Sequence, residues 1–300
     1  ELERMKKNGA RVIVDIPVRS PSGVIYGPEA VVKATKATLN EFPDRQLLGE
    51  DVIWIGNEEN NFLSSHRILS KATHQNHGAY GQATGKKIVY RVIADCACRN
   101  NQVYDEWLVR DQGAIIRQIG LDPKKYAANL IQEEGGVEKS SVPFNENTPL
   151  GGDYTSPTIS NENTGTRYAD ILKSIMNKDI GSVENNYDRA IQQEQPGGFT
   201  AHGTEEVSQF WKILLSAFPD AKFTIEHISF TDEKDQPKKA AIRWALVGSH
   251  SGKGNFGEPS NAQVYIMGIS HAEFGPRGIK NEWVLFDETM IWKQILMKTG

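Results

Sequence analysis

The sequence EWLVRD at residues 106–111 returns as EWVLFD at residues 282–287, 176 positions later. The same shift aligns residues 27–119 with residues 203–295 without a gap, and 20 of the 93 aligned positions are identical. Unrelated sequences of ordinary composition would share roughly five or six. The chain is therefore two copies of one unit, and a functional interpretation must explain both the unit and its duplication.

Other residues of distinctive chemistry are kept in both copies. They are Phe42-Pro43-Asp44 with Phe218-Pro219-Asp220, Arg67 with Arg243, His74 with His250, and Gly78 and Gly81 with Gly254 and Gly257. We interpret the Phe-Pro-Asp stretch as architecture, because Pro stops a helix and Asp favours the turn that follows. For Arg67 and Arg243 we expect an ion pair with Glu106 and Glu282, or anchoring of a substrate carboxylate.

Composition limits the partners of the chain. The formal charge is −4 and the pI about 6.0, without long charged blocks. Nucleic acid is not expected as the main partner, because phosphate binding needs a basic face. No stretch of eighteen apolar residues occurs, so no membrane span is expected. The length of 300 residues fits about two domains.

The chain has two cysteines, Cys96 and Cys98, whose spacing places both thiols on one face of a strand. We expect two small buried side chains, since a metal site would need further ligands. Without a disulfide framework, the composition favours a cytoplasmic location. The first residue is Glu1, so an export signal or tag removed before it stays an alternative.

Helical and strand periods divide the second copy into two parts. We expect helices at residues 168–176, at 185–193, and from an N-cap at Thr204 to Phe218, then strands around 223–228, 241–247, 264–272 and 282–287. A short helix at 290–297 ends the chain. Strands in succession with short links favour antiparallel pairing, so each unit is predicted to be α+β. Asn100-Asn101 and residues 275–278 are expected to form hairpin turns.

The expected domains are residues 1–130 and 166–300, joined by a linker at residues 131–165. The linker is rich in Gly, Ser, Asn, Thr and Pro, which predicts an exposed strap that lets the units dock side by side. The first unit follows the same plan from Pro28. The counterpart of the helix at 168–176 would lie before Glu1, so the first helix is expected to be missing or truncated.

Candidate functional residues come first from the repeated motifs. His74 and His250 sit at strand ends beside glycines, where they hold a loop through ring hydrogen bonds or line a pocket. Trp107 and Asp111, like Trp283 and Asp287, share one strand face. A carboxylate beside a large aromatic ring is partly desolvated, which suits acid or base catalysis. The alternative is that each Asp caps the following helix.

The clearest chemical difference between the copies is Asp95, which aligns with His271. Asp95 shares a strand face with Arg91 and could pair with it. His271 and Asp287 fall on neighbouring strands, where they could face one cavity and divide the acid and base roles. A metal site common to both units is not expected, because His77, near His74, aligns with Lys253.

Taken together, these motifs resemble those of the SnoaL-like polyketide cyclases of the nuclear-transport-factor-2-like superfamily. The resemblance rests on the Phe42-Pro43-Asp44 corner, the His74 loop, residues 82–86, the EWLVRD stretch and Gln118-Ile119-Gly120, with their second copies. The second copy departs from the family at Pro259-Ser260-Asn261, where Pro-Thr-Gly is usual. The resemblance covers most of both units and excludes the linker.

The resemblance implies two tandem cone-shaped α+β units, each a curved, mostly antiparallel sheet packed on about three helices around an apolar pocket. It also implies acid/base catalysis without metal or cofactor by Asp111 and Asp287, with His271 loosely matching the family's histidine. The first unit has Asp95 at the position equivalent to His271, which puts the activity of the first unit in doubt. The superfamily commonly dimerises through its sheets, so the fused copies would form an intrachain pseudo-dimer, with a further homo-oligomer left open.

The first functional hypothesis is a cofactor-independent cyclase, isomerase or hydrolase acting on a hydrophobic carbonyl compound or lactone. In it Asp287, His271 and Asp111 catalyse. The residues expected to bind substrate are His250, Trp283, His74, Trp107, Asp95 and Arg243. A non-catalytic binder of hydrophobic ligands and a protein-interaction module of the same fold are the alternatives.

Overall fold

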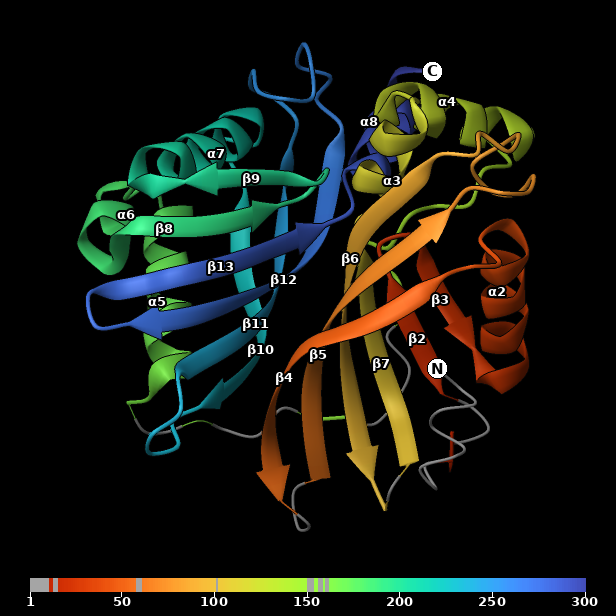
Figure 1. The fold of residues 1–300 in the computed structure, drawn as a ribbon. Coiled ribbons are helices and arrows are strands. Elements are labelled where there is room, and N and C mark those ends of the chain that lie inside the picture. The colour runs from red at the N-terminus through yellow and green to blue at the C-terminus, as the bar shows by residue number, and fades with distance from the viewer. Residues whose placement is uncertain are drawn as a thin grey trace.

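Two β-sheets, one from each copy, pack face to face in the computed structural model (Figure 1). The structure describes residues 11–12, 16–57, 61–100, 102–149, 154–155, 159 and 162–300. Apolar side chains from both sheets, among them Leu63, Ile93, Met267 and Leu285, form one core cluster between them. The fold is therefore α+β in two tandem units, as predicted, and the units form an intrachain pseudo-dimer.

The first sheet has seven strands, in the order β3-β2-β7-β6-β5-β4 with β1 beside β7. Its elements are β1 (Arg11–Val12), β2 (Pro17–Ser20), β3 (Gly23–Tyr26), α2 (Gly27–Glu41), β4 (Gln46–Asn57), β5 (Asn61–Thr73), β6 (Lys87–Arg99), β7 (Gln102–Arg110), α3 (Gln112–Ile119) and α4 (Pro123–Glu133). The four long strands β4 to β7 pair antiparallel, as their short connections predict.

The second sheet has six strands, in the order β10-β11-β12-β13-β8-β9. Its elements are α5 (Thr164–Met176), α6 (Gly181–Asn186), β8 (Tyr187–Gln195), β9 (Phe199–His202), α7 (Gly203–Ala217), β10 (Lys222–Thr231), β11 (Lys238–Ser249), β12 (Gln263–Gly275), β13 (Gly278–Phe286) and α8 (Glu288–Thr299). It repeats the strand order of the first sheet with the shift of 176 residues, and β8 takes the places of both β1 and β2. Elements α5 and α6 have no counterpart among the described residues of the first unit.

Local structure differs from the sequence prediction at two places in the second unit. The helix expected at residues 185–193 is mostly the strand β8, and only α6, which ends at Asn186, is helical. Strand β8 pairs parallel to β13, so partners distant in sequence override its weak local preference. Thr204 is not the N-cap of α7, because His202 holds that position; the Thr204 hydroxyl donates to Glu184 instead.

The turn at the end of β12 is confirmed at Gly275–Gly278, whereas the other expected turn includes residue 101, which lies outside the described residues. Residues 134–149 run from α4 along the junction of the two sheets, where the side chain of Phe144 is buried. No helix in the described ranges is long and apolar enough to cross a membrane.

Candidate functional site

The two units meet at a seam built from reciprocal contacts. The guanidinium carbon of Arg67 lies 3.5 Å from the ring centroid of Trp283, and that of Arg243 lies 3.7 Å from Trp107. Each pair is the counterpart of the other under the shift of 176 residues, as in the self-complementary interface of a twofold dimer. Cation–π contacts of this kind are favourable when they are desolvated. The repeated Trp and Arg residues therefore join the units, and their side chains point away from the cone interiors.

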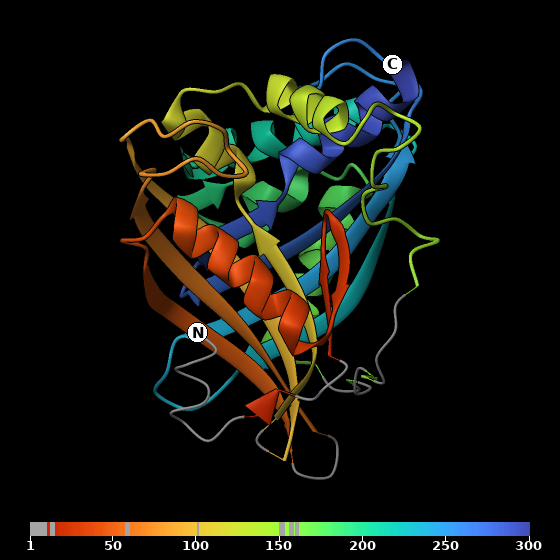
Figure 2. The ribbon, with the colours of Figure 1, turned by 90° about the vertical axis from the view of Figure 1, so that its right-hand side faces the viewer.

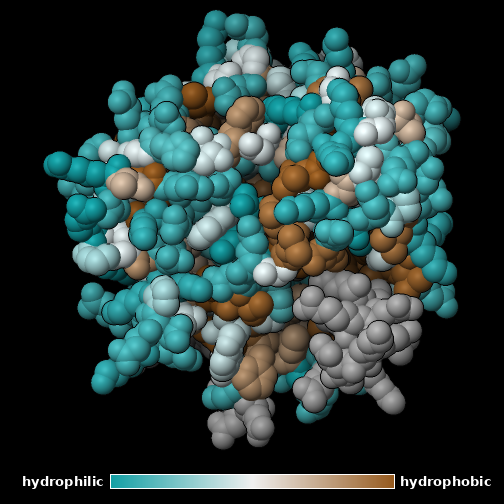
Figure 3. Space-filling model, in the orientation of Figure 1, coloured by the Kyte–Doolittle hydropathy of each residue, from teal (hydrophilic) through white to brown (hydrophobic). Residues whose placement is uncertain are grey.

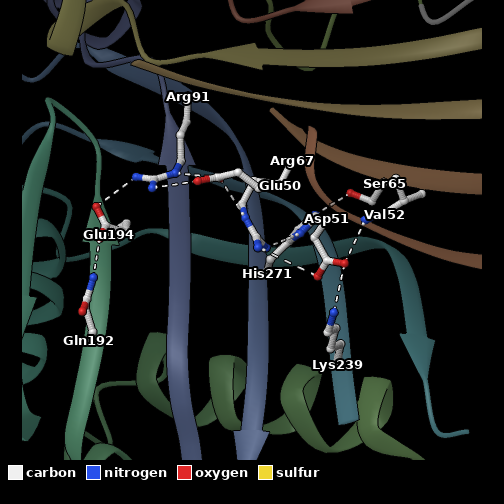
Figure 4. A network of polar contacts seen from close by, with 10 residues as sticks. All are labelled: Glu50, Asp51, Val52, Ser65, Arg67, Arg91, Gln192, Glu194, Lys239 and His271. Atoms are coloured by element: carbon white, nitrogen blue, oxygen red, sulfur yellow. Dashed lines mark hydrogen bonds and ion pairs between the residues drawn. The ribbon is translucent and has the colours of Figure 1, made fainter. Parts of the chain in front are cut away.

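Asp95 and His271 occupy equivalent places in this seam and pair differently. The Asp95 carboxylate binds the Arg243 guanidinium at 3.0 Å. His271 contacts the Ser65 hydroxyl at 2.7 Å and the Arg67 guanidinium at 3.2 Å (Figure 4). Burial and the charge of Arg67 hold the pKa of His271 well below its usual value, so the imidazole is neutral. The chemical difference between the copies thus lies at the seam.

Charged side chains continue the seam on both sides of His271 (Figure 4). Arg91 of the first unit binds Glu194 of the second at 2.9 Å and also binds Glu50, while Lys239 binds Asp51 at 3.0 Å. Arg91 was expected to pair with Asp95 on its own strand; its partners are instead Glu50 and Glu194. Likewise Arg67 and Arg243 pair with Glu50 and Glu226 rather than with the glutamates of the E-W motifs.

Asp111 and Asp287 cap the helices α3 and α8, in agreement with the capping alternative. Asp111 accepts hydrogen bonds from the backbone amides of Ala114, Gly197 and Gly198, and Asp287 from the amide and hydroxyl of Thr289. Burial raises the pKa of Asp111 to about 6 and that of Asp287 to about 7, and the charge of Glu288 adds to both. Both carboxyl groups therefore titrate near neutral pH.

The structure does not bring His271 and Asp287 together. His271 lies opposite Trp283 on the paired strand, and Asp287 follows four residues further along. At about 3.4 Å per residue, this separation is roughly 13 Å. His271 instead contacts side chains of the first sheet, whereas Asp287 remains at the start of α8.

His74 and His250 hold their loops in the same way in both units. The Nδ1 atom of His74 lies 3.1 Å from the Thr84 hydroxyl, and that of His250 lies 2.9 Å from the Ser260 hydroxyl. His74 also contacts Glu41 at 3.1 Å through Nε2. Both rings are fully buried, which agrees with the loop-holding alternative.

The inner face of the second sheet is filled by its own side chains. Ala240, Ile242, Trp244 and Leu246 of β11 are buried there, against Trp211 of α7 and the helix α5. Within this interior, the carboxylate of Glu282 accepts hydrogen bonds from the Tyr168 and Tyr187 hydroxyls and from the Gln193 amide. In the cone of the second unit, packed side chains occupy the place where a ligand would otherwise bind.

The inner face of the first sheet has different chemistry at the same positions. The counterparts on β5 are Ser64, His66, Ile68 and Ser70, of which only Ser70 is buried. On α2, Thr35 stands where α7 has Trp211. Figure 2 shows α2 lying obliquely across this sheet. Duplication therefore gave one filled cone and one whose inner face is polar and partly accessible.

Polar groups on this inner face line up across neighbouring strands. Ser64, Cys96 and Glu106 lie opposite one another in the register of β5, β6 and β7. The Ser64 hydroxyl is 2.8 Å from Nε2 of His66. Burial raises the pKa of the nearby Cys98 thiol, so this thiol stays protonated at neutral pH. The row thus provides a carboxylate, an imidazole and a hydroxyl on one concave surface.

Apolar side chains border that row on β4. Val52 and Trp54 are 46% and 50% exposed, whereas their counterparts Ile228 and Phe230 pack against the core of the second unit. Trp54 also contacts the ring of Phe62. Figure 3 shows hydrophobic residues gathered at the centre right of this face of the molecule, next to the grey atoms. Exposed aromatic groups beside polar ones are typical of small-molecule sites.

Comparison with known proteins identifies the fold family. Residues 165–295 match the family model described as SnoaL-like polyketide cyclase. The second unit is a SnoaL-like domain. The first unit repeats the strand order of this SnoaL-like domain, with the shift of 176 residues. None of the curated proteins matches the chain.

Several solved structures are similar to one SnoaL-like unit of this chain. AclR from Streptomyces galilaeus is 22% identical over 36% of this chain and 77% of its own, with a TM-score of 0.32. A SnoaL-like polyketide cyclase from Agrobacterium tumefaciens is 15% identical over 45% and 99%, with a TM-score of 0.36. TsrD from Streptomyces laurentii is 14% identical over 46% and 98%, with a TM-score of 0.38.

His66 and Glu106 are the inner-face residues that the sequence reasoning did not select. A signal for His66 was present in the repeat: where β11 of the SnoaL-like domain has Ala240 and Ile242, the first unit has Ser64 and His66. Glu106 gave no such signal, because it is kept in the second copy as Glu282. Within the described residues, no group of three or more His, Cys, Asp or Glu side chains could hold a metal ion.

Proposed function

We propose that the chain binds a small hydrophobic carbonyl compound or lactone on the inner face of the first unit and catalyses acid/base chemistry there. The observation that carries this proposal is the divergence of the two inner faces. The second is filled with apolar side chains, while the first presents His66 and Glu106 on a partly accessible surface. Polar side chains in place of apolar ones leave the first cone less well packed than the second, which costs stability. A functional role of these side chains offsets that cost.

In the proposed chemistry, Glu106 is the general base. Its carboxylate takes a proton from the carbon next to the substrate carbonyl, and the electron pair of that C–H bond moves into an enolate. The Nε2–H of His66 donates to the Ser64 hydroxyl, and this hydroxyl in turn donates to the enolate oxygen, where negative charge develops. An enolate is the common intermediate of aldol ring closure and carbonyl isomerisation, so the step fits both reactions of this class.

The spacing of these groups suits a bound molecule. His66 on β5 and Glu106 on β7 are separated by the strand β6. Neighbouring strands lie about 4.8 Å apart, so the two backbones are roughly 10 Å apart and leave room for a substrate between the side chains. Trp54 and Phe62 offer aromatic surface for an apolar ring.

The seam carboxylates are a second candidate set for the same acid/base role. Asp111 and Asp287 have pKa values raised to about 6 and about 7 by burial, a range that suits proton transfer at neutral pH. Both carboxylates also accept hydrogen bonds at helix N-termini, which fits a capping role. Mutation distinguishes whether these seam carboxylates or the inner-face residues Glu106 and His66 catalyse the reaction.

The decisive experiment measures deuterium exchange at carbon 1 of 2-tetralone in D2O by NMR. The rate is compared for the wild type, Glu106→Gln, His66→Ala and the matched control Glu282→Gln. We expect Glu106→Gln to lower the catalysed rate by about 100-fold or more, and Glu282→Gln to leave it unchanged. Loss of exchange in Asp287→Asn but not in Glu106→Gln would instead support the seam set. Binding of 2-tetralone without any exchange would support a non-catalytic binder.

A further inference from the structure

A pocket of about 360 Å³ opens between the two units. Its floor is the outer face of the first sheet, and its walls are α3 and the β8–β9 turn with β13 of the second unit. The residues that decide its character are Val89, Arg91, Ala114, Asp111, Glu194 and Trp283. This volume falls in the range of small-molecule sites. The pocket lies on the opposite face of the first sheet from the proposed catalytic surface.

Pseudo-symmetry places an equivalent space on the other side of the seam, and there a side chain of the chain itself fills it. Phe144 is 3% exposed and packs on Tyr265, with ring centroids 5.4 Å apart. Its amide donates to the carbonyl of Pro21, whose counterpart Gly197 lines the open pocket. Phe144 also joins the apolar cluster that includes Trp107, the counterpart of Trp283.

The frame of the two spaces is the same. Gln118 of α3 binds the backbone N–H and C=O of Val89, and its counterpart Gln294 of α8 binds those of Tyr265. The occupant is what differs: an aromatic ring from the linker fills one space, and the other is a pocket. A frame that already accepts a phenyl ring on one side is complementary to a phenyl ring on the other.

Charge defines the rest of the ligand. Arg91 is the cation of the pocket, and it already binds the two carboxylates Glu50 and Glu194. Asp111 and Glu194 are the two carboxyl groups within the lining. Acidic groups therefore outnumber basic ones, so a carboxylate ligand would meet repulsion while an ammonium group or a hydroxyl donor would be favoured.

We propose that this seam pocket binds a small aromatic compound that carries a cationic or hydroxyl donor group. The ring takes the place that Phe144 holds in the equivalent space, between Val89 and Trp283. The donor group faces the acidic side of the pocket at Asp111 and Glu194. This site is separate from the inner face of the first unit and does not depend on the catalytic proposal.

The test measures binding of 2-phenylethylamine by isothermal titration calorimetry, with 3-phenylpropanoate as the matched anion. We expect one site per chain for the amine and at least tenfold weaker binding of the anion. Val89→Arg places a long cationic side chain at the position of the ring, and it is expected to abolish binding of the amine while the melting temperature is kept. Glu106→Gln, on the other face of the sheet, is expected to bind as the wild type does.

Phe144→Ala gives an independent check, because it opens the equivalent space. We expect the stoichiometry for 2-phenylethylamine to rise from one site to two. Unchanged binding of the amine in Val89→Arg, or tighter binding of the anion than of the amine by the wild type, would overturn the proposal. Loss of binding in Glu106→Gln would place the amine on the inner face and would also overturn it, whatever the outcome of the exchange assay.

Discussion

The ion pair between Asp95 and Arg243 is expected to be a main stabilising contact of the seam. Both side chains are nearly fully buried, and the carboxylate and guanidinium lie 3.0 Å apart. Removing one partner of such a pair strands the other charge and costs about 3–5 kcal/mol. Arg243 keeps Glu226 at 3.2 Å and the ring of Trp107. We therefore expect Asp95→Ala to lower the free energy of unfolding by about 3 kcal/mol, the lower end of that range.

The equivalent contact on the other side of the seam provides the matched control. His271 is neutral and contacts the Ser65 hydroxyl and Arg67, so His271→Ala removes hydrogen bonds without leaving an unpaired charge of its own. This change is expected to cost about 1–2 kcal/mol. Urea unfolding followed by tryptophan fluorescence measures both variants. A loss below 1 kcal/mol for Asp95→Ala, or a larger loss for His271→Ala, would refute the reasoning.

Three further outcomes are expected. The pKa of Asp287 is about 7 in the folded state against 3.8 in the unfolded chain, so the folded state binds more protons between these values. The free energy of unfolding is therefore expected to fall by up to about 4 kcal/mol as the pH rises from 4 to 7. Asp287→Asn keeps the helix cap and should flatten that slope in urea titrations at each pH. Phe144→Ala should lower stability by about 3 kcal/mol, because a buried ring is lost. Thr35→Trp should fill the inner face as Trp211 does and slow the exchange of 2-tetralone, measured by NMR, while the melting temperature is kept.

Each of these outcomes has a clear opposite. If the free energy of unfolding changes with pH equally in Asp287→Asn and in the wild type, the titration of Asp287 does not cause the pH dependence. A Phe144→Ala variant as stable as the wild type would show that the ring is not packed in the seam. Unchanged exchange in Thr35→Trp would argue against a substrate on the inner face beside α2.

The repeat made the architecture predictable, because pairs of equivalent residues report one unit twice. The capping alternative for Asp111 and Asp287 and the antiparallel pairing of successive strands both followed from local patterns, and the structure confirms them. The strand β8 was missed because its pairing with β13 comes from residues about 90 positions away, which no local period reveals. The short strand β2 was missed for the same reason, because it pairs with β7.

Face assignment was the harder part of the site. The alternation along β13 correctly separates Glu282 from Trp283, but alternation alone does not say which face turns to the partner sheet. Trp283 turned out to face Arg67 of the other unit. Which cone is filled depends on the summed volume of side chains from several elements. The small Thr35 in place of Trp211 nevertheless indicates that the cone of the first unit is the less filled one.

The most direct test of the account is the exchange of 2-tetralone in Glu106→Gln beside Glu282→Gln, with folding of both verified by circular dichroism. The two residues are equivalent in the repeat, and they differ in that Glu282 is enclosed by Tyr168, Tyr187 and Gln193. We predict that catalysed exchange falls by about 100-fold or more in Glu106→Gln and stays at the wild-type rate in Glu282→Gln. Equal rates in the two variants, or loss of exchange only in Glu282→Gln, would contradict the assignment of chemistry to the first unit.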